Sequence, residues 1–267
     1  MNSILSTIGT KLVDRWLSLL ALPGVLFIVA AVWGHRAGHR RALDLGVGRA
    51  IQDAGVPTAL TAIFLAVAAV AVVYLARGSG ALVRTIWLGR WRGPAAPIAD
   101  AVVRCRRAAA ARSAARRGVD PIAVYLPARA TWMADRFRLA EARIAGQYHG
   151  LSLPVVWPRL WLLAPEETRA QIRTASSDFE STSMLTGWGL LYLALGALWY
   201  PAAVIGVVVM ATGCRRGRGR AGVLAELVES AVDVHLPLVL AATGVAPDEK
   251  LTRDVAQRIN DRFRKGV

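Results

Sequence analysis

The residues best suited to chemistry in this 267-residue chain form a short polar segment, DFESTS, at the start of a long apolar run. Carboxylates and hydroxyls of this kind attract cations and replace part of their water at the mouth of a pore. Repeated around a symmetric oligomer, the segment predicts a cation-attracting pore mouth; a polar helix end in water is the alternative. The pore-mouth candidates are Asp178, Glu180, Ser181, Thr182 and Ser183 of this segment, with Thr186 in the apolar run that follows.

Other chemistry-bearing residues are sparse. His35 and His39 stand four residues apart, but no carboxylate or cysteine stands at matching spacing, so the sequence predicts no metal site. Cys105 and Cys214 indicate neither a disulfide framework nor a zinc site. Phosphate-binding glycine loops, nucleophile elbows and zinc-peptidase motifs are absent from the sequence. We therefore expect a non-enzymatic protein without a cofactor; a lipid-directed enzyme would have only His149 and the two carboxylates above.

The apolar run after the polar segment, Met184–Cys214, has 31 residues and no charged side chain. About 20 apolar residues cross a bilayer as a helix, so the run is too long for one span and slightly short for two. Trp199 and Tyr200 suit a membrane interface, and Pro201 suits the first turn of a new helix. We predict a helical hairpin over 181–214 that turns at Tyr200; one long tilted helix is the alternative.

Two apolar segments near the N-terminus predict a first hairpin within residues 1–76. Trp16–Trp33 is uncharged and about 26 Å long as a helix, with a kink expected at Pro23 and Gly24; a signal peptide is the alternative. Val56–Ala76 is the second predicted span. Small residues recur along one face of this span, which predicts close packing against another helix. They are Thr58, Ala62, Ala66 and Ala69.

The segments 77–180 and 215–267 are predicted to fold as cytoplasmic helices. Helices are expected over 104–117, 131–147, 221–243 and 247–263, and from Glu166 into the third span. The 131–147 helix would bury Met133, Phe137, Ala140 and Ile144. The 221–243 helix carries an acidic stripe that is suited to pairing with the arginine-rich 104–117 segment, within one chain or between subunits. Its members are Glu226, Glu229 and Asp233.

Aromatic and arginine side chains near the predicted spans suggest contacts with lipid headgroups or an acidic partner. The expected interface anchors are Trp16, Trp33, Trp87, Trp91, Trp157, Trp161, Trp199 and Tyr200. The expected headgroup or partner contacts are Arg84, Arg90, Arg92, Arg104, Arg106, Arg107, Arg215, Arg216, Arg218 and Arg220.

Composition and charge favour a membrane protein over a nucleic-acid-binding one. The chain is 55% hydrophobic, with a mean hydropathy of +0.40 and a net charge of +15. Two segments are strongly basic: 77–117 has ten arginines and a single acid, Asp100, and 215–220 has four arginines. Both segments lie on the same side of the membrane only if the chain has four spans. The positive-inside rule then places both termini in the cytoplasm of a bacterial inner-membrane protein. We expect an all-α fold of two transmembrane hairpins with a helical cytoplasmic domain.

The stretches ATWMADRFRLAEARI, YHGLSLPVVWPRLWLL and AELVESAVDVH, with the hairpin between them, resemble a group of integral membrane proteins of high-GC bacteria. The resemblance implies no activity and no functional residue. From the residues we expect a homo-oligomer that binds anionic lipids and forms or gates a pore, as a channel or as a membrane-permeabilising effector responding to a cytoplasmic signal. The alternative is a membrane-anchored adaptor that docks a cytoplasmic protein through its arginine-rich and acidic helices.

Overall fold

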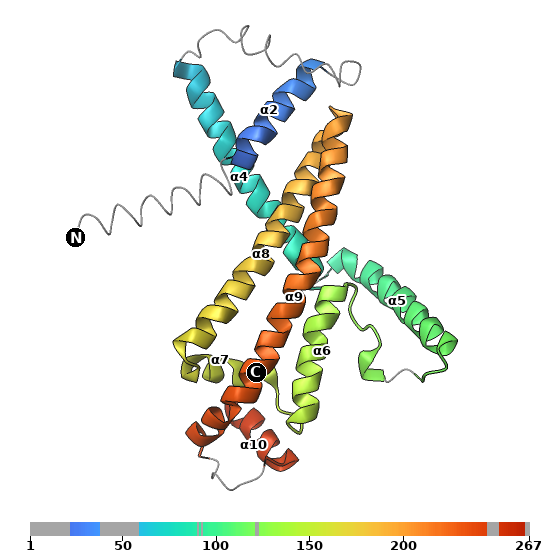
Figure 1. The fold of residues 1–267 in the computed structure, drawn as a ribbon, viewed down its shortest axis with the longest axis vertical. Helices are drawn as coiled ribbons and strands as arrows, with labels where there is room; N and C mark the ends of the chain where they lie inside the picture. Colours follow the sequence, from blue (N-terminus) through green and yellow to red (C-terminus); the bar gives the residue numbers. More distant parts are fainter. Residues whose placement is uncertain are drawn as a thin grey trace, which may run out of the picture. The chain divides into compact units, whose positions relative to one another are not determined.

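A computed structural model describes residues 22–37, 59–89, 91, 93–120, 123–244 and 251–264. Over these residues the chain is helical and contains no strand, so the predicted all-α class is confirmed (Figure 1). The helices are α2 (Leu22–Ala37), α4 (Ala59–Trp87), α5 (Ala96–Arg116), α6 (Trp132–Gln147), α7 (Leu153–Leu163), α8 (Glu166–Leu195), α9 (Tyr200–Ala242) and α10 (Arg253–Phe263). Two short 3-10 turns lie at Gly93–Ala95 and Ala123–Tyr125.

The chain divides into two compact units. Unit 1 holds the described residues up to Val83 together with Thr182–Cys214, and unit 2 holds Arg84–Ser181 and the residues from Arg215 onward. Helices α4, α8 and α9 contribute residues to both units. The unit boundaries lie within seven residues of the predicted segment boundaries, but the placement of either unit in a membrane stays a prediction.

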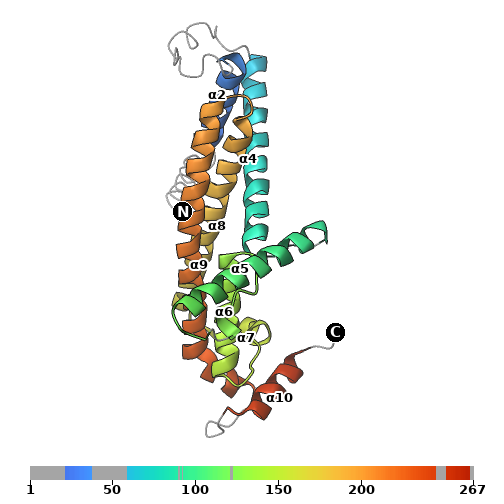
Figure 2. The same cartoon turned by 90° about the vertical axis from the view of Figure 1, so that its right-hand side faces the viewer.

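The helices of unit 1 approach one another closely at glycines. A Cβ added to Gly187 of α8 would lie 2.6 Å from the amide nitrogen of Gly80 in α4. A Cβ on Gly189 would lie 2.9 Å from the carbonyl oxygen of Gly206 in α9, and α8 and α9 run side by side (Figure 2). Small residues permit this approach of backbones, which is the packing typical of helices in lipid.

Unit 1 carries many large apolar side chains on its outside. Its buried residues include Val72, Ala76 and Trp188, and the ring of Phe27 meets that of Tyr192 edge-on at 5.3 Å. Soluble monomers rarely expose large contiguous apolar patches. The exposed apolar residues of unit 1 include Leu26, Val29, Val32, Val67, Val70, Tyr74, Leu75, Leu82, Val204, Ile205, Val207 and Val208.

One helix among the described residues, Val67–Trp87, is long and apolar enough to cross a membrane, so the four predicted spans are not confirmed. Helix α8 ends at Leu195, five residues before the predicted turn at Tyr200. Its uncharged part, 181–195, has 15 residues, and so has the uncharged start of α9, 200–214. At 1.5 Å per residue each measures about 22 Å, whereas the hydrocarbon core is about 30 Å thick.

Two predicted helix boundaries are corrected by the structure. The second half of the hairpin and the 221–243 helix form one continuous helix of 43 residues, α9, because the glycines within RRGRGR continue the helix. Gly217 packs there against Trp87: an added Cβ would lie 2.7 Å from its ring. Helix α10 begins at Arg253, with the Thr252 side chain accepting from the Val255 amide at 3.4 Å, and Pro247 lies outside the described residues.

The core of unit 2 joins α6, α7, α8, α9 and α10. Ile144, Val156, Ile172, Val232 and Ile259 are buried together, one from each of these helices. Met133, Ala140 and Ile144 of α6 are buried as the 3.6-residue period predicts. This cluster holds α6, α7 and α9 together, and these helices line a pocket of unit 2.

Candidate functional site

The two carboxylates of the predicted pore mouth are held in ion pairs within unit 2. Asp178 on α8 lies 2.9 Å from a guanidinium nitrogen of Arg220 on α9, and Glu180 lies 2.6 Å from one of Arg84 on α4. The four side chains are 40–55% exposed. Pairs this exposed typically contribute less than about 1 kcal/mol each, so they orient the carboxylates more than they stabilise the fold.

The hydroxyl residues of the same segment are buried in unit 1. Thr182, Ser183 and Thr186 are 3–6% exposed. The Thr186 hydroxyl donates to the carbonyl oxygen of Thr182 at 2.9 Å, and Gly213 of α9 packs directly against that hydroxyl. Ser181 is exposed, and its hydroxyl donates to the carbonyl of Asp178. In a single chain, three of the four hydroxyls therefore lie inside helix packing, where they do not line an open mouth.

Several predicted interface anchors have contacts within the chain. Trp87 is 7% exposed, and its ring lies 5.8 Å from that of Phe179, so it is a core residue of unit 2. Trp157 and Trp161 lie 5.9 Å apart and pack against the core cluster. The Trp91 indole donates to the Ile86 carbonyl at 2.9 Å.

The remaining predicted anchors lie in unit 1 or beyond the described residues. Tyr200 is 45% exposed, and Trp199 packs against Gly34 of α2. Helix α2 includes position 33, but the side chains of Trp33 and His35 are not among those described, and neither are those of Ala62 and Ala66. Residues outside the described ranges include Trp16, His39, Val56, Thr58, Arg90 and Arg92.

The arginines expected to meet lipid or a partner fall into two groups. Arg84 and Arg220 pair with the carboxylates above, and Arg106 and Arg107 bind the segment that precedes α6. The others among the described residues are exposed, namely Arg104, Arg215, Arg216 and Arg218. The first group is therefore engaged within the chain.

Within the chain, two residues of the acidic stripe of α9 contact α6 and its C-cap residue rather than residues 104–117, and a pairing between subunits stays a prediction. Glu229 lies 3.4 Å from Arg143, and Asp233 accepts a hydrogen bond from the Tyr148 hydroxyl at 2.8 Å. Burial, and next the hydrogen bond and charge of Asp233, raise the pKa of Tyr148 to about 12. The stripe contacts α6 because α6 and α9 pack on the same core. The side chains of Arg106 and Arg107 bind the segment that precedes α6.

Asp135 organises the entry to α6, although no sequence motif singles it out. Its side chain is buried, and Oδ1 accepts from the backbone amides of Ala128 and Arg129 at 2.8 and 2.9 Å. Arg106 of α5 lies 2.7 Å from Oδ2, and Arg138 lies 3.4 Å from Oδ1. These donors compensate for the cost of burying the carboxylate.

Residues 123–131, here called the strap, are held by arginines as well as by Asp135. Arg138 donates to the carbonyls of Val124 and Leu126 at 2.9 and 3.1 Å, and Arg107 donates to that of Pro127 at 2.7 Å. At its end, the Thr131 hydroxyl caps α6 by accepting from the Ala134 amide at 3.2 Å. The same hydroxyl donates to the Trp87 carbonyl, which ties the strap to the end of α4.

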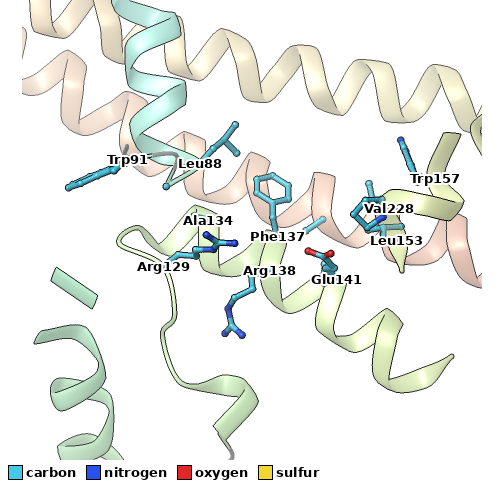
Figure 3. A pocket seen from close by; sticks show the side chains of 14 residues that line it. Leu88, Trp91, Arg129, Ala134, Phe137, Arg138, Glu141, Leu153, Trp157 and Val228 are labelled. Carbon is cyan, nitrogen blue, oxygen red and sulfur yellow. The ribbon is translucent and has the colours of Figure 1, made fainter. Parts of the chain in front are cut away.

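A pocket of about 640 Å³ lies where the strap, the end of α4 and helices α6, α7 and α9 meet in unit 2 (Figure 3). Gly89 ends α4 with a φ of +66°, and its Cα lies against Ala134 and the stem of Arg129. A side chain there would be strained and would press on both. Lining residues include Leu88, Trp91, Phe137, Leu153, Trp157 and Val228, together with the charged Arg129, Arg138 and Glu141.

The chain matches no model of a known protein family, and neither a curated protein nor a solved structure is significantly similar to it. Among the described residues no group of three or more histidine, cysteine or acidic side chains is placed to hold a metal ion. The class of the protein is thus set by its own structure: an all-α chain of two units, one with an apolar exterior and one with arginine-rich surfaces and a pocket. The likeness to membrane proteins of high-GC bacteria remains an expectation from the sequence.

Proposed function

We propose that this protein is a multi-pass protein of the bacterial inner membrane that acts as a non-enzymatic adaptor. The apolar exterior and glycine-packed interior of unit 1 support its insertion in lipid, because helices in a bilayer associate through small residues and turn large apolar ones outward. The basic segments 77–117 and 215–220 support a cytoplasmic unit 2 with both termini on that side, next to anionic lipid headgroups.

The observation that carries the adaptor function is the exposure of α5. Ala114 is the single buried residue of this 21-residue helix. Arg106 and Arg107 bind the strap, but Arg104, Arg112 and Arg116 are exposed, and one end of α5 stands clear of the other helices of unit 2 (Figures 1 and 2). A helix that is polar nearly all round buries too little to be ordered by its own chain alone, so an acidic protein surface is the partner that fits it.

Cys105 offers a direct test, because it is exposed on α5 between two arginines, whereas Cys214 lies half-buried on α9. A photo-crosslinker attached at Cys105 of the full chain in native membranes should yield one discrete protein adduct. Replacing Arg104 and Arg112 by Gln should remove that adduct, while the crosslinker at Cys214 in a Cys105→Ser chain serves as the matched control. Crosslinks to lipid only, with no protein adduct at Cys105, would contradict the adaptor proposal.

A pore is the second candidate function. The observation that favours it is the pair of half-exposed carboxylates, Asp178 and Glu180, directly before buried hydroxyls; in one chain, Arg220 and Arg84 neutralise these carboxylates. Opening would require that these ion pairs separate in an oligomer. Mass measurement of the purified protein and ion flux from liposomes test this. A ring of five or more chains whose flux changes selectivity in Asp178→Ala/Glu180→Ala supports the pore, and a monomer or dimer without flux supports the adaptor.

A further inference from the structure

The unit 2 pocket combines an apolar interior with charges at its rim. Leu88, Phe137, Leu153 and Val228 supply apolar surface, together with the rings of Trp91 and Trp157 (Figure 3). Its volume of about 640 Å³ lies within the range of pockets that enclose drug-sized ligands. Arg129 and Glu141 are exposed at its open side. Such a pocket suits an amphiphile with a charged head.

The two rim charges are available to a ligand. Within the part of the chain that the structure describes, neither the guanidinium of Arg129 nor the carboxylate of Glu141 forms an ion pair. Arg138 also lines the pocket, but its guanidinium binds Asp135 and two strap carbonyls, and Figure 3 shows it pointing away from Phe137. The head of the ligand therefore meets one cation and one anion.

The backbone holds Arg129 in place before any ligand arrives. Its amide donates to Asp135 at 2.9 Å, its carbonyl accepts from Arg106, and its Cδ would lie 4.0 Å from a Cβ at Gly89. Glu141 projects from the middle of α6, whose Met133, Ala140 and Ile144 are buried in unit 2. A preformed pair of opposite charges lowers the entropy cost of binding a zwitterion.

The chain around the pocket also indicates where the ligand comes from. Leu88, Gly89 and Trp91 line the pocket and directly follow Trp87, the last residue of the helix segment that is long and apolar enough to cross a membrane. If α4 crosses the bilayer, as the proposed function requires, these residues lie at its cytoplasmic end beside the lipid headgroups, because a helix of 29 residues is about as long as a bilayer with its headgroups is thick. Tryptophan is enriched at that level.

We propose that this pocket binds a phospholipid with a phosphoethanolamine headgroup, and this inference rests on the proposed membrane location. The phosphate accepts from the Arg129 guanidinium, the primary ammonium donates to Glu141, and the first part of the acyl chains lies on the apolar floor near Phe137 and Leu153. An anionic glycerol headgroup leaves Glu141 without a partner. A choline headgroup has no N–H to donate to it.

The test is native mass spectrometry of the full chain released from detergent after incubation with an equimolar mixture of phosphatidylethanolamine, phosphatidylglycerol and phosphatidylcholine. The wild type should carry mainly the ethanolamine lipid. Glu141→Gln should lower that adduct about tenfold and leave the glycerol lipid unchanged, because one charge-assisted contact is lost. Arg129→Gln should lower all three adducts. The matched control is Glu226→Gln, which changes an exposed carboxylate of α9 outside the pocket.

Each outcome bears on the inference. Equal adducts of the three lipids, or the same loss in Glu226→Gln as in Glu141→Gln, would overturn it. Free phosphoethanolamine that competes as strongly as the lipid would overturn the lipid source and assign the site to a soluble ligand. Should Arg129→Gln misfold, Arg129→Lys keeps the charge and should retain phosphate binding. Alkaline carbonate extraction tests the membrane location separately, so ethanolamine-lipid selectivity in an extractable protein would refute the proposed function alone.

Discussion

Replacing Asp135 by Ala should release the strap from α6, and this substitution probes the contact on which both the strap and Arg129 depend. Asp135 is 6% exposed and serves four donors: two backbone amides of the strap, Arg106 and Arg138. Alanine leaves the amides of Ala128 and Arg129 without acceptors and leaves Arg106 without its counter-ion. Asparagine keeps an oxygen for the amides but loses the charge.

The structure sets the size of the expected effects. A hydrogen bond to a charged group contributes about 1.5–3 kcal/mol, and removing one partner of a buried ion pair costs about 3–5 kcal/mol. Since the Arg106 side chain is 26% exposed and regains water, we expect about 3 kcal/mol for Asp135→Ala. For Asp135→Asn we expect about 1–2 kcal/mol, because the two amide contacts survive.

Limited proteolysis measures this free energy at the strap itself. Tyr125 lies within the strap and is 54% exposed, so chymotrypsin should cut after it once the strap opens. When opening is fast relative to cleavage, the cleavage rate follows the population of the open form. A loss of about 3 kcal/mol then raises that rate about a hundredfold, or until the strap is fully open.

Two controls decide whether the reasoning holds. Glu141→Ala lies on the same helix but removes a carboxylate with no ion pair among the described residues, so cleavage after Tyr125 should not change. Arg106→Ala should accelerate cleavage less than Asp135→Ala, and the double variant should be less than additive. Cleavage of Asp135→Ala within about twofold of the wild type, with helix content unchanged, would refute the central role of this carboxylate.

Three further predictions concern other contacts. Gly187→Ala should lower the thermal stability of the detergent-solubilised protein, because the new Cβ meets the Gly80 backbone, whereas Gly78→Ala, with open space around it, should be neutral or stabilising by up to about 1 kcal/mol. Absorbance titration should show Tyr148 ionising near pH 12, and at a lower pH that stays above 10 in Asp233→Asn, because burial, the largest cause of the raised pKa, remains. Because the folded pKa is raised, the stability from this contact is complete below about pH 10 and is lost as the pH rises through about 12. Asn260→Ala removes two hydrogen bonds of 3.0 Å: Asn260 Oδ1 accepts from the Ser152 backbone amide, and Asn260 Nδ2 donates to the Gly150 carbonyl. Amide exchange across α10 should therefore speed up in line with a loss of about 1–2 kcal/mol.

The sequence was informative where a local pattern fixes the structure. The helix predicted over 131–147 is found at Trp132–Gln147, because its apolar period and the Thr131 cap act within one segment. The helix predicted from Glu166 into the apolar run is α8, which begins after Pro165 with two acidic residues in its first turn. The hairpin turn is predicted at Tyr200, but α8 ends five residues earlier, at Leu195, and α9 begins at Tyr200. Gly196 lies in this turn with room only for a hydrogen beside Ala203.

The partners of charged residues were not accessible from the sequence, because they depend on which helices pack together. Asp135, Arg138 and Glu141 follow one another at helical spacing, yet the first is buried and the last is exposed beside the pocket. The excess of arginine over acid in 77–117 indicates that acidic residues elsewhere in the chain will form ion pairs with these arginines. It does not identify those acids: Arg106 pairs with Asp135, 29 residues later in the sequence, only because the strap folds back toward α5.

Basic residues outnumber acidic ones in this chain, and this bears on the charges that line the pocket. The chain has 33 lysines and arginines against 18 aspartates and glutamates, so arginines are available to pair with many of the carboxylates in unit 2. Asp135, Asp178, Glu180 and Glu229 all pair with arginine. Glu141 forms no ion pair among the described residues; the same holds for other exposed carboxylates such as Glu226, but Glu141 lines the pocket. Arg129 lines the same pocket and, within the described part of the chain, has no ion pair either, which favours a ligand that itself carries both charges. The Glu141→Gln arm of the lipid competition tests this argument directly.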